Sequence, residues 1–383
     1  MTPEQQAWLT QCRHALHQSP ELSGEEERTA ARIVELLQGF APDQVLTGLG
    51  GHGIAAIYDS GQDGSVVGIR CELDGLPIQE ISDQPYVSQV PGKGHLCGHD
   101  GHMVMVLGVA QALAARRPTR GRVVLIFQPA EETGQGAIAY RADSRFEELG
   151  LDYVFSLHNL PGLALGTVEL CQGPANCASR GMRIVLTGKT SHAAAPQDGV
   201  SPAGALARLM HALAGLGPAA ALNTDYALTT VTHSRLGAAT FGVAPGEAEL
   251  WVTLRTVTDA RMEQLIAEAE ALVQDVARDE GLSVQISYDD VFEACINNAE
   301  AVAVLASACA AQQVSCAQVS DPQRFSEDFG QFGKSAKSAM FWLGSGAEQP
   351  QLHNPDYDFP DALIPIGTGI FLAAIDQVLG VRA

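Results

Sequence analysis

The chain has 383 residues, 46% of them hydrophobic and 17% charged, so it holds enough apolar material for a packed interior. This length exceeds one ordinary core and predicts two domains. The 23 basic residues are outnumbered by 44 acidic ones, and the net charge of −21 repels phosphate backbones and anionic lipids. We therefore expect neither nucleic acid nor a membrane surface as a partner.

The N-terminal segment MTPEQQAWLTQCRHALHQ lacks the basic and continuous apolar regions of a secretory signal. No later run approaches the ~20 apolar residues of a membrane span. Eight cysteines are scattered along the chain without any CxxC pair, a usage that does not resemble a disulfide framework. We expect a cytoplasmic protein in which most cysteines are buried reduced thiols.

The first part of the chain alternates predicted helices and strands. Apolar residues spaced three and four apart predict helices over 3–18 and 25–39, and SGEEE (23–27) predicts a capped start for the second. Strands are predicted at GIAAIYD (53–59), SVVGIRCELD (65–74), RVVLIFQ (122–128) and YVFSLHN (153–159), with a helix around 101–115. This alternation predicts an α/β domain with a largely parallel sheet, whose sites form at the carboxyl ends of the strands.

A separate module is predicted from about residue 180. Its pattern of strands and helices reads β-α-β-β-α-β, the split βαβ arrangement of a ferredoxin-like module. Helix and strand patterns resume afterwards at 299–312 and 338–343. We therefore expect an α/β protein of two domains, in which a discontinuous larger domain (1–178 and 291–383) is interrupted by an inserted lid domain (179–290).

The segment GHLCGHDGHM (94–103) carries the first chemically informative residues. It places Cys97 and His99 two residues apart on a glycine-flanked loop before a predicted helix. Thiolate and imidazole are ligands that zinc and related ions accept, and this spacing lets both side chains point into one site. Taken alone, however, the loop is weak evidence, because a single cysteine is usually a small core residue.

Three further segments strengthen the metal hypothesis. Glu131 and Glu132 follow the strand VVLIFQ, and adjacent carboxylates ending a buried strand repel one another unless a cation or proton lies between them. One can ligate while its neighbour abstracts a proton. A histidine also ends the strand YVFSLHN, and another lies in the polar loop QLHNPDYDFP. Together the segments supply five ligands, a number that suits two ions sharing a bridging water: Cys97, His99, Glu132, His158 and His353.

These residues resemble the peptidase M20 family, and within it the amidohydrolases that include hippurate hydrolases, N-acyl-amino-acid amidohydrolases, auxin-conjugate hydrolases and N-acetyldiaminopimelate deacetylases. The resemblance covers nearly the whole chain. Its ordered motifs are ELSGEEERTA near the start, GIRCELDGLPIQE (68–80), CGHDGH (97–102), FQPAEETGQGA (127–137), SLHNLP (156–161), TSHAAAP (190–196), FSEDFGQF (325–332) and LHNPDYDF (352–359).

The resemblance implies a role for each candidate residue. It aligns the five ligands with those of two divalent ions, and Glu131 with the general base. It implies that Asp74 orients a ligating histidine, and that His192 of the lid reaches across a homodimer to the developing oxyanion. The implied fold is a di-metal aminopeptidase-like α/β catalytic domain with a ferredoxin-like lid and dimerisation domain.

One stretch departs from the family pattern. Relatives commonly carry Asn-Val-Ile-Pro in the lid, where this chain has Gly242-Val243-Ala244-Pro245, so an amide side chain credited with substrate contact is absent. Recognition of a substrate carboxylate then needs another group. Arg255, in the LRT sequence at the end of a predicted strand, is a candidate bidentate partner for that carboxylate.

We expect a metal-dependent amidohydrolase that cleaves an N-acyl amino acid, such as an N-acetyl or N-benzoyl one, with zinc, manganese, cobalt or nickel as the ion. Three alternatives stay open. A dipeptidase or carboxypeptidase would use the same centre, and a substrate panel separates it. A non-catalytic metal-dependent binding protein would show no turnover with any metal. A hydrolase with Cys97 as nucleophile and His99 as base would stay active in a chelator.

Overall fold

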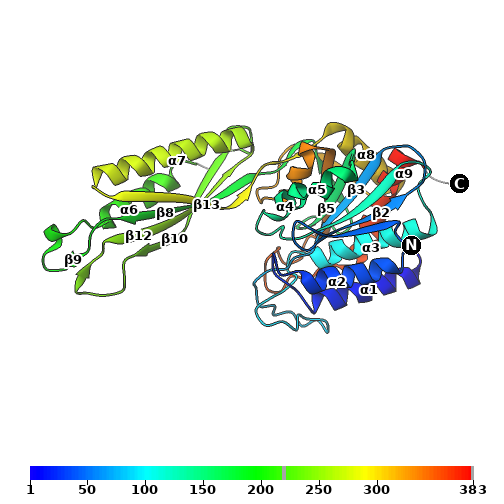
Figure 1. Ribbon diagram of the computed structural model, residues 1–383, viewed down its shortest axis with the longest axis horizontal. Helices are drawn as coiled ribbons and strands as arrows, with labels where there is room; N and C mark the ends of the chain where they lie inside the picture. The colour runs from blue at the N-terminus through cyan, green and yellow to red at the C-terminus, as the bar shows by residue number, and fades with distance from the viewer. Residues whose placement is uncertain (218–220, 381–383) are drawn as a thin grey trace. The chain divides into compact units, whose positions relative to one another are not determined.

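The computed structural model describes residues 1–217 and 221–380. The chain forms two compact units (Figure 1), which we call unit 1 (Met1–Ala175, Cys295–Ser320 and Asp328–Ala383) and unit 2 (Asn176–Ala294 and Asp321–Glu327). The sequence pattern placed 321–327 in the larger domain, whereas this segment packs with unit 2. The physical reason is a bridge between Asn176 and Gln323, where the Cys177 N–H donates to the Gln323 carbonyl at 3.0 Å.

Unit 1 is built on an eight-stranded mixed sheet. The strand order is β1 (Gln44–Leu49), β2 (Gly53–Asp59), β4 (Arg122–Gln128), β3 (Val66–Glu72), β5 (Tyr153–Pro161), β16 (Lys337–Gly346), β6 (Val168–Cys171) and β15 (Cys316–Val319). The central strands β4, β3, β5 and β16 run parallel to one another, and β15 runs parallel to β6. Antiparallel pairing joins β1 to β2, β2 to β4 and β16 to β6. The carboxyl ends of the central strands therefore lie at one edge.

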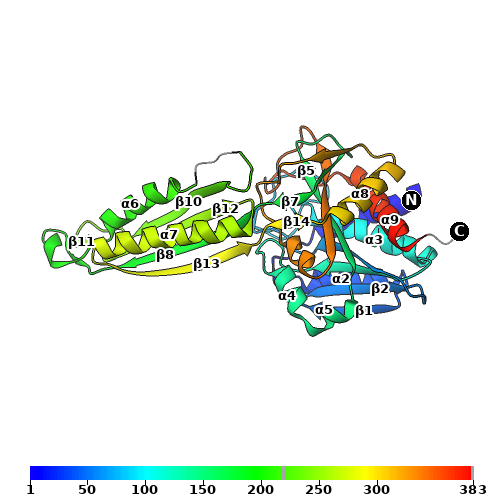
Figure 2. The same ribbon diagram turned by 90° about the horizontal axis from the view of Figure 1, so that it is seen from above.

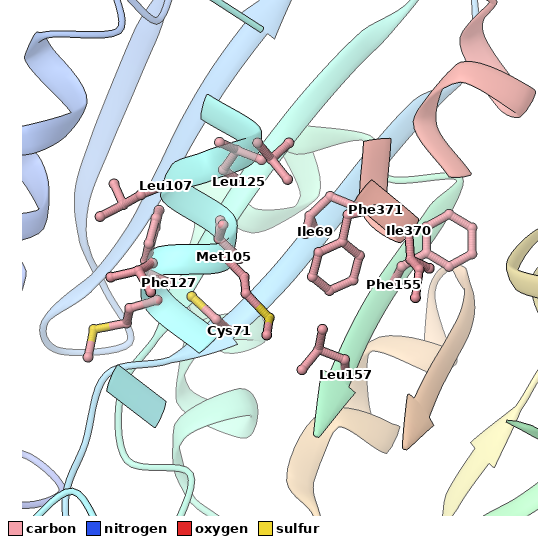
Figure 3. Close-up of a cluster of buried hydrophobic side chains, with 14 of the residues drawn as sticks. Ile69, Cys71, Met105, Leu107, Leu125, Phe127, Phe155, Leu157, Ile370 and Phe371 are labelled. Atoms are coloured by element: carbon pink, nitrogen blue, oxygen red, sulfur yellow. The ribbon is translucent and has the colours of Figure 1, made fainter. Parts of the chain in front are cut away.

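Helices cover the sheet of unit 1 and form its main core. The elements α1 (Pro3–His17), α2 (Glu27–Gln38), α3 (His99–Ala115), α8 (Ala299–Ala311) and α9 (Ile364–Leu379) share one hydrophobic cluster with the strands. Figure 3 shows part of this cluster, where Met105 and Leu107 of α3 and Phe371 of α9 lie with Ile69 and Phe155 of the strands. The shorter α4 (Gly136–Ala142), α5 (Ser144–Leu149) and 3-10 helix η2 (Asp328–Lys334) pack together through aromatic rings. The core thus fixes α3 against the strand ends.

Unit 2 has the β-α-β-β-α-β order that the sequence predicts. Its four antiparallel strands lie in the order β10 (Ala227–Leu236), β12 (Glu247–Thr256), β8 (Ala178–Thr187) and β13 (Ser283–Phe292). The helices α6 (Ala203–Ala214) and α7 (Asp259–Asp279) pack against this sheet and against one another (Figure 2). A small ribbon pairs β9 (Ser191–His192) with β11 (Val243–Ala244). The expected α/β fold with a ferredoxin-like module is confirmed.

The sequence predicts no run that approaches a membrane span, and one helix comes near that length. The segment Asp361–Leu379 has 19 residues and is apolar enough to cross a membrane by length and composition alone, a test that buried core helices also pass, and 56% of its window is buried. The expected cap of α2 is absent, because the N-cap residue Glu26 makes no side-chain cap hydrogen bond. Its carboxyl group and the Ser23 hydroxyl instead bond to Ala130 and Asp74.

Candidate metal centre

The candidate metal ligands of unit 1 lie at strand ends and at the start of α3. His99 is the first residue of α3, and Cys97 precedes it by two residues. Glu131 and Glu132 follow β4, and His158 lies near the carboxyl end of β5. His353 lies in the loop after β16 with a left-handed φ of 66°. A non-glycine residue in that region is strained, and such residues cluster at functional sites.

Two glycines of the CGHDGH motif allow the close packing that this arrangement requires. Gly98 has a left-handed φ of 98°, and a Cβ there would lie 2.3 Å from Oδ1 of Asn159. At Gly101 a Cβ would lie 2.5 Å from the ring of Phe359. Because glycine has no side chain, α3 can approach both β5 and the C-terminal loop at these two positions. The start of α3 is thereby held beside the segments that carry His158 and His353.

The donor atoms of the expected ligands converge. Cys97 Sγ lies 3.4 Å from His158 Nε2, and His353 Nε2 lies 3.5 Å from Glu132 Oε2. His99 Nε2 lies 3.9 Å from one oxygen of Glu131 and 3.9 Å from one oxygen of Glu132. Among the groups whose ligand atoms lie mutually close, three consist of expected site residues: Cys97, His99 and His158; Cys97, Glu132 and His353; His99, Glu131 and Glu132. Cys97 is common to two groups that differ in their other members.

Asp74 contacts the ring of His99 through its backbone carbonyl. His99 Nδ1 lies 2.8 Å from the Asp74 carbonyl oxygen and 3.6 Å from the carboxylate Oδ1. The carboxylate Oδ2 instead accepts hydrogen bonds from the Glu132 N–H at 3.0 Å and from the Ser23 hydroxyl at 2.7 Å. Asp74 therefore contacts the segments of two expected ligands, and His99 Nε2 is left to face the two glutamates.

The donor set fits a divalent cation. His99 Nε2 is buried and has no hydrogen-bond partner within residues 1–217 and 221–380. Burial lowers the pKa of His99, but Asp74, Glu72 and Glu132 outweigh it and raise that pKa to about 10, so the surroundings favour a positive charge here. Burial and the neighbouring His102 lower the pKa of His158 well below its ordinary value, which leaves the neutral ring that a metal requires.

The same electrostatics argue against Cys97 as a nucleophile. Burial and the nearby Glu132 and Glu131 raise the pKa of its thiol well above the ordinary value. A nucleophilic cysteine needs a lowered pKa and an electropositive environment. A thiolate at this position is therefore expected only beside a cation.

A buried polar network next to the ligands was not predicted from the sequence. His102 Nδ1 lies 2.7 Å from a Glu72 oxygen, and its Nε2 lies 2.6 Å from Asn159 Oδ1. Asn159 in turn donates to the Tyr357 hydroxyl at 2.5 Å. The sequence feature that could have revealed this network is His102, the second histidine of CGHDGH. It follows His99 by three residues and so lies on the same side of a helix. This network connects β3, α3, β5 and the loop that carries His353.

The two expected lid residues lie in unit 2. The Nδ1 of His192 accepts a hydrogen bond from the Ala194 N–H at 3.0 Å, so the proton of the neutral ring is on Nε2. The His192 side chain is exposed. Arg255 of β12 donates from Nη1 to the Arg324 carbonyl at 3.0 Å and to the Ser326 hydroxyl at 2.9 Å, and burial lowers its pKa. The guanidinium nitrogen Nη1 of Arg255 is thus hydrogen-bonded within unit 2.

Comparisons with known proteins identify the family. The chain matches the model of peptidase family M20/M25/M40 over residues 68–377. It is 30% identical to the hippurate hydrolase of Campylobacter jejuni, over 92% of this chain and 91% of that protein. It is 26% identical to the N-acetylcysteine deacetylase of Bacillus subtilis, over 95% and 94%. The solved YxeP protein of Bacillus subtilis, described as a dinuclear metal-binding peptidase of the M20 family, has a TM-score of 0.82 at 24% identity, covering 99% of both chains.

The family match extends over most of the sequence motifs and agrees with the donor set at the sheet edge. It confirms the resemblance inferred from the sequence and sets aside the alternative of a non-catalytic binding protein. The chain belongs to peptidase family M20/M25/M40 and is a metal-dependent hydrolase of amide bonds.

Proposed function

We propose that the protein cleaves the amide bond of an N-acyl amino acid, releasing a carboxylate and a free amino acid. The observation that carries this proposal is the placement of two carboxylates, Glu131 and Glu132, at equal distances of 3.9 Å from the buried Nε2 of His99. One carboxylate suffices as a ligand, which leaves the other for proton transfer. The names of the hippurate hydrolase and N-acetylcysteine deacetylase relatives support an N-acyl amino acid as the substrate class.

Two divalent ions are proposed for the centre. Cys97, His99, Glu132, His158 and His353 would hold them, with Cys97 as a donor within reach of both groups of ligands. The description of the YxeP protein as dinuclear supports this number. The mixed sulfur, nitrogen and oxygen donors accept zinc, manganese, cobalt or nickel.

The mechanism assigns a separate task to each side chain. When bound, the ions would lower the pKa of a water molecule and polarise the amide carbonyl. Glu131 takes a proton from the attacking water and later returns it to the departing amine. His192, with its proton on Nε2, donates to the oxyanion that develops on the carbonyl oxygen. Asp74 holds His99 in the orientation that ligation requires.

The lid roles rest on a homodimer. We propose that unit 2 mediates dimerisation and that His192 acts on the centre of the partner subunit. We also propose that Arg255 pairs with the substrate carboxylate through guanidinium nitrogens other than Nη1, which is bound to Arg324 and Ser326. We also propose that the protein works in the cytoplasm on small molecules.

The test compares Glu131→Gln with Glu132→Gln after reconstitution with each ion. We expect Glu131→Gln to retain two ions per chain and to lose about 10²–10⁴ in turnover of N-acetyl and N-benzoyl amino acids. Glu132→Gln should lose metal. Wild-type turnover by Glu131→Gln would refute the base assignment. Faster hydrolysis of dipeptides than of every N-acyl amino acid would favour the exopeptidase instead.

A further inference from the structure

Two buried carboxyl groups contact the backbone on either side of Glu131. Glu26 Oε1 accepts a hydrogen bond from the Ala130 N–H at 2.8 Å, and Asp74 Oδ2 accepts one from the Glu132 N–H at 3.0 Å. Both Glu26 and Asp74 have 0% exposure. The residue before the proposed base and the residue after it are therefore each fixed by an acid from another part of the chain.

The turn that carries Glu131 has a strained residue. Ala130 adopts a left-handed φ of 50°, a conformation that is unfavourable for a residue other than glycine. The turn is also tight, because the Gly136 N–H donates to the Ala130 carbonyl at 3.0 Å and a Cβ at Gly136 would lie 1.6 Å from the Pro129 oxygen. Such a conformation persists only where its surroundings hold it.

Within residues 1–217 and 221–380, the Glu26 side chain accepts hydrogen bonds from backbone N–H groups alone. Glu26 is the N-cap residue of α2, yet its side chain does not cap that helix. Its Oε1 accepts a second hydrogen bond, from the Gly24 N–H at 2.9 Å, and the neighbouring Ser23 hydroxyl donates to Asp74 at 2.7 Å. The segment 23–26 thus contains Glu26 and also supplies the hydroxyl group that donates to Asp74.

We propose that Glu26 is a positioning residue for Glu131: by holding the Ala130 N–H, it keeps the strained turn in the conformation that points the base at the reacting water. This inference rests on the proposed function of Glu131. The hydrogen bonds of the Glu26 side chain go to the Ala130 and Gly24 N–H groups, so Glu26 acts through the backbone. A misplacement of about 1 Å at a reacting group can cost about 100-fold in rate.

The experiment measures kcat, KM, metal content and urea unfolding for Glu26→Asp, Glu26→Gln and Glu26→Ala in the full-length metal-loaded protein. Glu26→Asp keeps the charge but is one carbon too short to reach both N–H groups, whereas Glu26→Gln loses the charge but keeps an oxygen at the same reach. We expect kcat to fall about 10- to 100-fold in Glu26→Asp and Glu26→Ala, with KM within about twofold and two ions per chain retained. Glu26→Gln should recover kcat to within about threefold of the wild type.

Glu25→Gln is the matched control, because Glu25 is 57% exposed and pairs only with Lys93 in the described residues. Wild-type kcat per folded molecule in Glu26→Ala and Glu26→Asp would overturn the proposal, and so would an active Glu26→Asp beside an inactive Glu26→Gln, since charge and not reach would then matter. If Glu131→Gln is itself fully active, the proposed function fails and not this inference alone.

Amide hydrogen exchange of the wild type keeps the proposal testable if the variants do not fold. We expect the Ala130 N–H to exchange slowly, because it donates to a buried carboxyl group. Exchange of this amide at the rate of an exposed loop would contradict the hydrogen bond on which the proposal depends.

Discussion

The guanidinium of Arg13 lies 3.0 Å from the carboxylate of Asp100, and both side chains have 0% exposure. The same Arg13 nitrogen lies 3.0 Å from Asp358, in the C-terminal loop that also carries His353. One cation from α1 thus joins the first turn of α3 to that loop. Asp100 directly follows the expected ligand His99. The ion pair therefore helps to hold the first turn of α3, and His99 with it, in place.

Removing Arg13 should destabilise the fold strongly. In Arg13→Met the buried Asp100 loses one of its two charged partners, because only His17 then lies beside it, and breaking a buried ion pair typically costs about 3–5 kcal/mol. Urea unfolding of the metal-free protein measures this loss. Arg32→Met serves as control, because the Arg32–Glu35 pair is exposed and should contribute only about 0–1 kcal/mol. Equal losses in both variants would contradict the argument.

His17 should make stability depend on pH in the alkaline range. Burial lowers its pKa, but Asp100 and Glu80 outweigh burial and raise that pKa to about 10, above its ordinary value of 6.5. A group whose pKa is raised by folding stabilises the protein fully below pH 6.5, and this contribution is lost as the pH rises through about 10.

His17→Gln removes the titrating ring from this position. Urea unfolding at intervals between pH 6 and 10 should therefore show a smaller decline for the variant than for the wild type. Taking the difference between the two proteins cancels the groups that titrate in both. Parallel curves over this interval would show that His17 is not held as a cation.

The space at Gly98 gives a prediction with an internal control. Gly98→Ala introduces a Cβ 2.3 Å from Asn159 at a left-handed φ of 98°, whereas Gly51→Ala does so at φ 117° with nothing within 4 Å. Both variants carry backbone strain, but only the first also overpacks the centre. We expect Gly98→Ala to lose about 1–3 kcal/mol more in the free energy of unfolding, and also to lose metal affinity. Similar values for both would mean that Asn159 moves away without cost.

The family departure at Gly242 can be reversed. A Cβ at this position meets nothing within 4 Å, so Gly242→Asn should fold and melt like the wild type. If the lid amide of relatives contacts the substrate carboxylate, the variant should lower KM for N-acyl amino acids about 2- to 10-fold, the worth of one hydrogen bond of about 0.5–1.5 kcal/mol. An N-acyl amine without a carboxylate is the control substrate. An equal change in KM for both substrates would refute carboxylate recognition.

Much of the fold was predictable because it is encoded locally. The periodic patterns of 25–39 and 101–115 match α2 and α3, and the strand patterns match the central strands within a few residues. The insertion of β16 between β5 and β6 was not predictable, since strand order depends on contacts distant in the sequence. The mixed sheet also contains more antiparallel pairing than the helix–strand alternation suggested, because β1 and β2 form a hairpin.

The expected metal ligands were predictable because residues of ligand type follow the predicted strands. Cys97, His99, Glu132, His158 and His353 are recognisable as potential ligands by residue type, and the structure brings them together in the groups described above. The supporting residues were harder to find. The sequence SGEEE looks like a helix cap, and only the fold reveals that Ser23 and Glu26 turn away from α2 toward Asp74 and Ala130.

The place of β16 has a consequence for biosynthesis. Unit 2 consists almost entirely of the continuous stretch Asn176–Ala294, so a growing polypeptide has the material for the lid module before β16 is translated. Until then, β5 and β6 lack their common neighbour, and the bare edge of an apolar strand invites pairing with other chains. Polypeptides terminated prematurely after the lid should therefore aggregate, and they would also lack His353. If His353 is a metal ligand as proposed, the centre can be completed only after the residues that follow β16 have been translated.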